Sequence, residues 1–263
     1  MSTSSNTFTQ DWPLKRVGLK VLDLATSLDY YTRLGFTIVR DQSAEGEVGL
    51  GSGSRELLTL RVLEHGRPRP PHTAGLFHFA ILLPDEVELG SFLRHCMEQH
   101  IPVDGVSDHL VSQALYLSDP EGNGIEVYAD RDRKGWQWEG GNIKMDTLPL
   151  NAQALLRQAK PFKGFSPQTR LGHMHLNVGD LDSSKAFYQH LGMDLMADIP
   201  QGRASFLSWD GYHHHLGINL WAGRHVHPVE PDVSGLEFFE IQRPGLVPGT
   251  LKDADGVAVV VLE

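Results

Sequence analysis

Hydrophobic and polar residues alternate in short runs along this chain, and a helical run follows the first strand of most groups. Residues 171–221 show the pattern most fully. Residues 172–178 alternate as a half-buried strand, and a helix with an apolar face begins near Asp180 and ends at Gly192. Three further runs are typical of strands joined by turns and lie at 193–197, 204–209 and 214–221. This stretch therefore predicts one βαβββ module.

The module occurs four times, so the pattern predicts an α+β fold. The segment VLDLATSLDYYTRLGF of the first copy aligns closely with VGDLDSSKAFYQHLGM of the third. In the first copy, strands are predicted at 17–22, 36–40, 47–51 and 57–63, with a helix that begins within 23–27, continues over 28–34 and ends at Gly35. In the second copy, strands are predicted at 77–83, 113–117 and 124–128, with a helix over 88–100. The fourth copy is abbreviated, with strands at 235–241 and 257–262 and residues 244–252 in place of the helix.

The copies group into two predicted domains. Residues 14–130 hold the first two copies, and residues 170–263 hold the third and the abbreviated fourth. The polar, Ser/Thr-rich residues 1–13 are expected to form a flexible N-terminus. Residues 131–169 lack strand alternation and are expected to connect the two halves. Residues 67–72, with the sequence RPRPPH, indicate a stiff linker between the first two copies.

Composition excludes several classes of partner. The 263 residues carry a formal net charge of −10, with no basic stripe, so binding to nucleic acid or to an anionic membrane surface is not expected. No apolar run approaches 18 residues, so no membrane span is expected. The single cysteine, Cys96, excludes an internal disulfide, and we expect a buried thiol and a cytoplasmic protein. A homodimer is compatible with the sequence, although no residue pattern specifies one.

The repeat allows equivalent positions to be compared. Seven residues before the aspartate that starts each helix stand Arg16, His78 and His173, and alignment of the fourth copy adds Phe238. On the last strands the equivalent residues are Glu56, Glu126, His215 and Val260. Imidazole and carboxylate groups suit a divalent first-row metal ion. Copies two and three therefore present a candidate metal site, and copies one and four do not.

Three motifs make the chain recognisable. The pattern HxHLxVxDLxxSxxFY and the segments SDPEGNGIEVYADR and GYHHHLGINLW resemble the vicinal oxygen chelate superfamily, the glyoxalase/bleomycin-resistance/extradiol-dioxygenase group, and in particular its bacterial catechol-2,3-dioxygenase-like branch. The resemblance covers nearly all of residues 14–263. It implies four βαβββ modules that form two cup-shaped mixed sheets. It also implies metal ligands on the first and last strands of two paired copies, which carries over onto His78, Glu126, His173 and His215.

The resemblance implies an enzyme that cleaves a catechol-like aromatic diol with dioxygen and holds Fe(II), or alternatively Mn(II). This sequence departs from the family pattern at two places, and both affect which copies are expected to pair. Arg16 stands where the family often has a histidine, and the fourth copy lacks the glutamate of many extradiol enzymes. Pairing of copies three and four would leave only His173 and His215, whereas pairing of copies two and three would bring four ligands into one cup. We expect the second arrangement.

Acid–base work in such a site would fall to His109, Tyr128 or His213, since extradiol chemistry moves a catechol proton. Two other functions stay open. A glyoxalase-like isomerase or lyase would use the metal as a Lewis acid only, and a small-molecule binding or resistance protein would hold no metal. Four metal ligands would favour the isomerase, and three with open positions would favour the dioxygenase.

Overall fold

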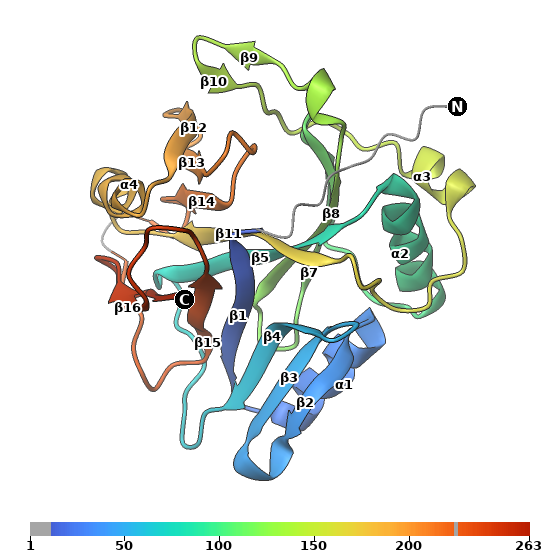
Figure 1. Cartoon of the computed structure of the whole chain (residues 1–263). Helices are drawn as coiled ribbons and strands as arrows, with labels where there is room; N and C mark the ends of the chain where they lie inside the picture. Colours follow the sequence, from blue (N-terminus) through green and yellow to red (C-terminus); the bar gives the residue numbers. More distant parts are fainter. Residues whose placement is uncertain (1–11, 224–225) are drawn as a thin grey trace.

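The computed structural model describes residues 12–223 and 226–263, and within them it contains all four modules (Figure 1). The first module comprises β1 (Leu14–Val21), α1 (Leu24–Leu34), β2 (Thr37–Gln42), β3 (Glu47–Ser52) and β4 (Arg55–Val62). The second comprises β5 (Gly75–Leu83), α2 (Glu86–Glu98), β6 (Gly105–Asp108), β7 (Ser112–Ser118) and β8 (Gly124–Asp130). The third comprises β11 (Arg170–Asn177), α4 (Leu181–His190), β12 (Asp194–Ile199), β13 (Ala204–Ser208) and β14 (Leu216–Asn219). The fourth comprises β15 (Gly235–Ile241), β16 (Gly249–Lys252) and β17 (Ala258–Val261), and has no helix.

The remaining elements are short. The connector contains the hairpin β9 (Trp138–Glu139) and β10 (Asn142–Ile143) and the helix α3 (Ala152–Gln158). Two single-turn 3-10 helices, η1 (Ser43–Glu45) and η2 (Arg133–Gly135), complete the chain. Strands β6 and β16 were not predicted, and β14 is shorter than the predicted strand at 214–221 because residues 211–215 form a turn.

The modules pair crosswise to form two mixed sheets. A seven-stranded sheet has the order β16-β17-β15-β1-β4-β3-β2, and an eight-stranded sheet has the order β12-β13-β14-β11-β5-β8-β7-β6. The central contacts are antiparallel, β1 with β15 and β5 with β11 (Figure 1). Copies two and three therefore share one sheet, as expected, and copies one and four share the other. The sheets follow this pairing and not the predicted division into 14–130 and 170–263.

An aspartate begins the helix in each of the three complete modules. Asp23, Asp85 and Asp180 accept hydrogen bonds from the backbone N–H three residues later, at 2.8 to 3.0 Å. Such N-caps satisfy N–H groups that the helix itself leaves unpaired. The capping aspartate therefore fixes where the first strand ends, and the residue seven positions earlier takes the same place in each module.

Buried tyrosines connect neighbouring modules. Tyr31 of α1 donates to Asp119 at 2.8 Å, and Tyr188 of α4 donates to Asp253 at 2.9 Å. Both tyrosines are fully buried in the core. Each aspartate lies in the turn before the last strand of the following module, so the first helix is tied to module two and the third helix to module four.

The chain segments outside the sheets also pack tightly. Residues 1–11 of the predicted flexible N-terminus lie outside the described residues. Trp12, at its end, donates to the Leu171 carbonyl at 2.7 Å and packs edge-on against Tyr212. Helix α3 approaches α2 so closely that a Cβ at Gly90 would lie 2.4 Å from the Leu155 carbonyl oxygen. Within the described residues, none of the helices has the length and apolar character needed to cross a membrane.

Candidate metal centre

Three side chains from neighbouring strands converge on one point of the eight-stranded sheet. His78 extends from β5, Glu126 from β8 and His173 from β11. The Nε2 atoms of His78 and His173 lie 3.2 Å apart, and the Oε2 atom of Glu126 lies 3.0 Å from the first and 3.1 Å from the second. All three residues are buried. The structure therefore brings together three of the four ligands that the sequence predicts.

The electrostatics of this triad favour the forms that bind metals. Burial alone would raise the pKa of the Glu126 carboxyl, but His173 and His78 hold that pKa well below its usual value. Burial lowers the pKa of His173 to about 4 although the Glu126 charge opposes the change. Among the described residues, Glu126 has ion-pair contacts only with these histidines and with no lysine or arginine. A neutral His173 imidazole beside an ionised carboxylate is the protonation state that a metal ion requires.

His215, the fourth predicted ligand, does not join the triad. Its Nδ1 atom lies 2.7 Å from the Ser208 hydroxyl, and its ring packs against Trp12 and Trp209. The reason is the register of the strands. Glu126 lies beside Ala80, two residues after His78, whereas the residue beside His175, two after His173, is Gly217. The module-three equivalent of Glu126 is thus a glycine, and the prediction for His215 was wrong.

Two other histidines line the space beside the triad. The ring of His214 lies 4.1 Å from that of His173, and the ring of His175 lies 4.8 Å from that of His78. Burial and the neighbouring histidines lower the pKa of both, so both are neutral near pH 7. A Cβ added at Gly217 would lie 2.9 Å from the His175 ring, so this imidazole occupies the space that a side chain at position 217 would need. His214 was not predicted as a cavity residue, because the sequence predicts a strand over 214–221 whereas β14 begins at Leu216.

The three acid–base candidates lie in two places. His109 lines the cavity, and its Nδ1–H donates to the Asp146 carbonyl at 2.8 Å. The Nε2 atom of His109 therefore accepts from the Tyr116 hydroxyl, 2.6 Å away. Tyr116 was not among the site residues predicted from the sequence. Tyr128 and His213 do not line the cavity.

Tyr128 and His213 belong to a buried hydrogen-bond chain behind His173. The Tyr128 and Tyr212 hydroxyls lie 2.7 Å apart, and Tyr212 donates to Asp130 at 3.1 Å. The same Asp130 oxygen lies 2.9 Å from Nε2 of His213, whose Nδ1 lies 2.8 Å from Nδ1 of His214. The chain therefore reaches the cavity only through His214.

A cavity of about 790 Å³ opens over the triad. His78 and Glu126 form part of its wall, together with the aromatic side chains of Phe77, Phe206 and Trp221. Residues 145–147 of the connector close one side. A volume of this size accommodates a small organic molecule, and an apolar wall with a few convergent polar groups is typical of a ligand site.

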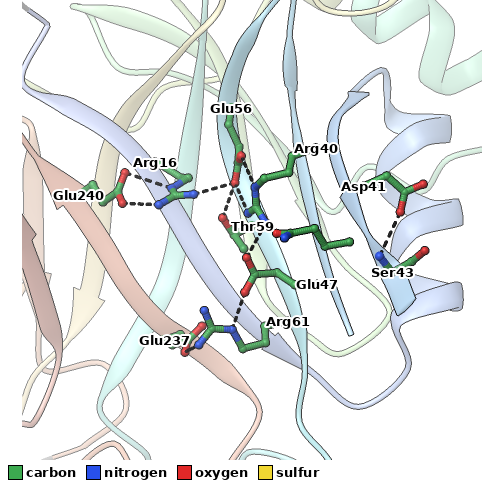
Figure 2. Close-up of polar contacts among 11 residues, drawn as sticks. Arg16, Arg40, Asp41, Ser43, Glu47, Glu56, Thr59, Arg61, Glu237 and Glu240 are labelled. Carbon is green, nitrogen blue, oxygen red and sulfur yellow. Dashed lines mark hydrogen bonds and ion pairs between the residues drawn. The ribbon is translucent and has the colours of Figure 1, made fainter. Parts of the chain in front are cut away.

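The seven-stranded sheet carries an ion-pair network at the corresponding place (Figure 2). Arg16, the equivalent of His173, donates to Glu56 at 2.8 Å and through Nε to Glu240 at 3.0 Å. Glu56 also accepts from Arg40 at 2.8 and 3.0 Å. Phe238 lies under the Arg16 guanidinium, 5.4 Å from ring centroid to Cζ. Among the described residues, no metal-binding group of three forms here.

Fold and sequence together define the class of this protein. The sequence model of the Glyoxalase/Bleomycin resistance protein/Dioxygenase superfamily matches residues 14–127 and 170–246. The chain belongs to this superfamily, whose vicinal oxygen chelate fold agrees with the two curled mixed sheets described above.

One sequence relative and one solved structure show how similar the chain is to individual proteins. The Catechol-2,3-dioxygenase of Bacillus subtilis (strain 168) is 41% identical over 232 residues, which cover 86% of this chain and 81% of that protein. The crystal structure of glyoxalase I from Zea mays superposes with a TM-score of 0.57 and 18% identity, covering 94% of this chain and 91% of that one. At this level of identity the second likeness shows the fold alone.

Proposed function

We propose that the protein is a metal-dependent extradiol dioxygenase that cleaves the ring of a catechol-like diol. The observation that carries the proposal is the set of three ligands, His78, Glu126 and His173, with Gly217 at the place of a fourth. Two histidines and one carboxylate leave coordination positions open for substrate and dioxygen. A site with four protein ligands would instead favour the isomerase reading. The 41% identity to a catechol-2,3-dioxygenase supports the same reaction.

The side chains present fit an iron or manganese ion. The ionised Glu126 carboxylate is buried and has no cationic side chain beside it among the described residues, so a divalent cation would supply the charge that it lacks. Nitrogen and oxygen donors suit Fe(II), which we propose as the resident metal, with Mn(II) as the alternative. When bound, the ion would hold the two vicinal oxygens of the substrate and dioxygen on one centre.

The remaining residues have defined tasks in this proposal. Phe77, Phe206 and Trp221 pack against the substrate ring and keep water from it. The substrate must lose a hydroxyl proton, and the Tyr116 hydroxyl that faces the cavity already donates to Nε2 of His109. A proton can therefore pass from the substrate to the Tyr116 oxygen as the Tyr116 proton moves to His109. The bond from His109 to the Asp146 carbonyl fixes the tautomer that accepts it.

His214 also lines the cavity, and its ring lies 4.1 Å from that of His173. The Asp130–His213 pair behind it orients the His214 ring through the contact between the two Nδ1 atoms. Tyr128 then acts on position only, by packing its ring 4.9 Å from that of His173.

Metal content of protein purified without oxygen tests the proposal. Near-stoichiometric iron or manganese is expected in the wild type and in His215→Asn, because His215 lies outside the triad. His78→Ala and His173→Ala should both lose the metal, since each removes one of three ligands. Catechol turnover, followed by absorbance of the ring-cleaved product, should fall in His109→Gln without loss of metal. A metal-free wild type that binds aromatic ligands would contradict the dioxygenase and favour the binding protein.

A further inference from the structure

One arginine faces the cavity without a carboxylate partner. Arg69 donates from Nη1 to the Leu76 carbonyl at 2.8 Å and from Nη2 to the Gly122 carbonyl at 3.1 Å. These partners are neutral, and none of the carboxylates in residues 12–223 and 226–263 forms an ion pair with it. Burial lowers the pKa of Arg69, but a guanidinium keeps its charge near pH 7. A half-buried positive charge thus lines the proposed substrate site of an acidic protein.

The carboxylate that acts on Arg69 from a distance is fully engaged elsewhere. Asp119 contributes an attractive charge to Arg69 without a direct contact. Its Oδ2 atom accepts from the Tyr31 hydroxyl at 2.8 Å and from Asn123 at 2.9 Å, and its Oδ1 atom accepts two backbone N–H groups. Asp119 is therefore held in its own turn, and it leaves the donors of Arg69 free for a ligand.

The backbone around Arg69 is constrained before any ligand binds. Prolines stand at positions 68, 70 and 71, and the Pro70 carbonyl accepts from the Thr73 hydroxyl at 2.7 Å. A guanidinium carries five N–H donors in one plane, and two of them hold Leu76 and Gly122. The other three donors can bind both oxygens of a carboxylate, the geometry that arginine favours. A stiff linker lowers the entropic cost of holding the side chain there.

The distance from Arg69 to the metal centre limits the ligand. Leu76, whose carbonyl Arg69 holds, lies two residues before His78 on β5, and two residues of strand span about 6.6 Å. The rings of Phe77 and Trp221 also line the cavity, and their centroids lie 5.0 Å apart. An aromatic ring bound at the triad would therefore need only a short side chain to reach Arg69.

We propose that Arg69 forms an anion subsite, and that the substrate is a catechol that carries a carboxylate on a short side chain. The inference rests on the proposed function for the position of the ring, and on Arg69 alone for the charge. In a dioxygenase for uncharged catechols, an unpaired arginine in the cavity would have no ligand to bind and would only add a desolvation cost. The presence of Arg69 therefore favours a substrate with a negative charge.

Equilibrium binding of two matched phenols tests the subsite without any turnover. Calorimetry at pH 7.5 compares 4-hydroxyphenylacetate with 4-hydroxyphenylacetamide, which has the same shape and no charge. The wild type should bind the acid about 10- to 100-fold more tightly, the range expected for a charge-assisted bidentate contact. Arg69→Gln should abolish this preference by weakening the acid only, and Arg69→Lys should restore part of it.

Arg67→Gln is the matched control, because Arg67 lies in the same linker but pairs with Glu230 and Asp232. It should keep the preference for the acid. Equal affinity of the wild type for acid and amide, or no binding of either phenol, would overturn the proposal. So would loss of both affinities together in a folded Arg69→Gln, which indicates a structural role. Absence of catechol cleavage with a retained preference would instead defeat the dioxygenase and leave the anion subsite standing.

Discussion

The two sheets of this protein surround equivalent first-strand positions with different chemistry, His78 and His173 in one sheet and Arg16 in the other. In the eight-stranded sheet, the Glu126 carboxylate faces two imidazoles, of which His173 is held neutral by burial. In the seven-stranded sheet, the Glu56 carboxylate faces the guanidinium groups of Arg16 and Arg40 (Figure 2). The first arrangement lacks a positive charge and the second supplies its own. The same modular frame thus gives a site that needs a cation and a site that excludes one.

The two carboxylates also differ in whether they serve stability or ligand binding. A carboxylate matched by two arginines contributes to folding but offers nothing to a ligand. A buried carboxylate with no permanent cation costs stability until a metal arrives, which is common for residues kept for function. Substitutions in the two sheets should therefore have opposite consequences.

Metal affinity should show the largest contrast. Glu126→Gln removes the anionic ligand and should lower metal affinity by more than about 100-fold, beyond the effect of losing a supporting residue. Glu56→Gln should leave the affinity unchanged, because Glu56 lies in the other sheet. Chelator competition measures both. Equal losses in the two variants would mean that the sheets are coupled and that the comparison fails.

Stability of the metal-free protein should show the reverse order. Glu56→Gln leaves Arg16 and Arg40 without one partner and should cost about 1–3 kcal/mol of unfolding free energy, a value reduced by the partial exposure of the network. Glu126→Gln should change it by less than about 1 kcal/mol, because the lost attraction to the two histidines is offset by removal of the desolvation cost of a buried charge. Urea unfolding measures the difference, and a larger loss in Glu126→Gln would contradict it.

Lowering the pH should remove the stabilisation of the fold that the ionised Glu56 carboxylate provides. Burial would raise the pKa of Glu56, but Arg40, Thr59 and Arg16 lower it from 4.5 to about 2. A lowered carboxyl pKa stabilises the fold above pH 4.5, and this contribution is lost as the pH falls from 4.5 to 2. The stability gap between wild type and Glu56→Gln should therefore shrink over that window. Glu45→Gln, at an exposed site of η1, is the control and should show no gap at any pH.

A methyl group at the fourth position should have the smallest effect. Gly217→Ala places a Cβ 2.9 Å from the His175 ring, which must move by a few tenths of an ångström. We expect a stability loss of about 1 kcal/mol and little change in metal affinity, because His175 is not in the triad. Thermal unfolding and chelator competition measure the two quantities. A large loss of metal would show that His175 takes part in binding.

Much of this fold can be predicted from the sequence. Capping aspartates and the βαβββ repeat fix the strand positions locally, so counting seven residues back locates His78, His173 and Arg16. Glu126 follows from the last strand of its own module. These predictions depend on local spacing, which the chain records directly.

Predictions that depend on the register between strands were less reliable. Sequence reasoning extended β14 through His215, whereas the strand begins at Leu216 after a turn. The same cause hid His214, which lies nearer to His173. Glu240 was missed as the partner of Arg16 because it comes from β15, more than 200 residues away. Long-range register is set by sheet assembly, which a single sequence does not display.

The crosswise pairing of modules has a consequence for synthesis of the chain. Strand β1 hydrogen-bonds with β15, so one face of the first module stays incomplete until the ribosome has made the last thirty or so residues. The triad of His78, Glu126 and His173 likewise needs β11 as well as β5 and β8. Neither sheet can form from one half of the chain, so chains truncated before β15 should leave the β1 edge open and should aggregate through it.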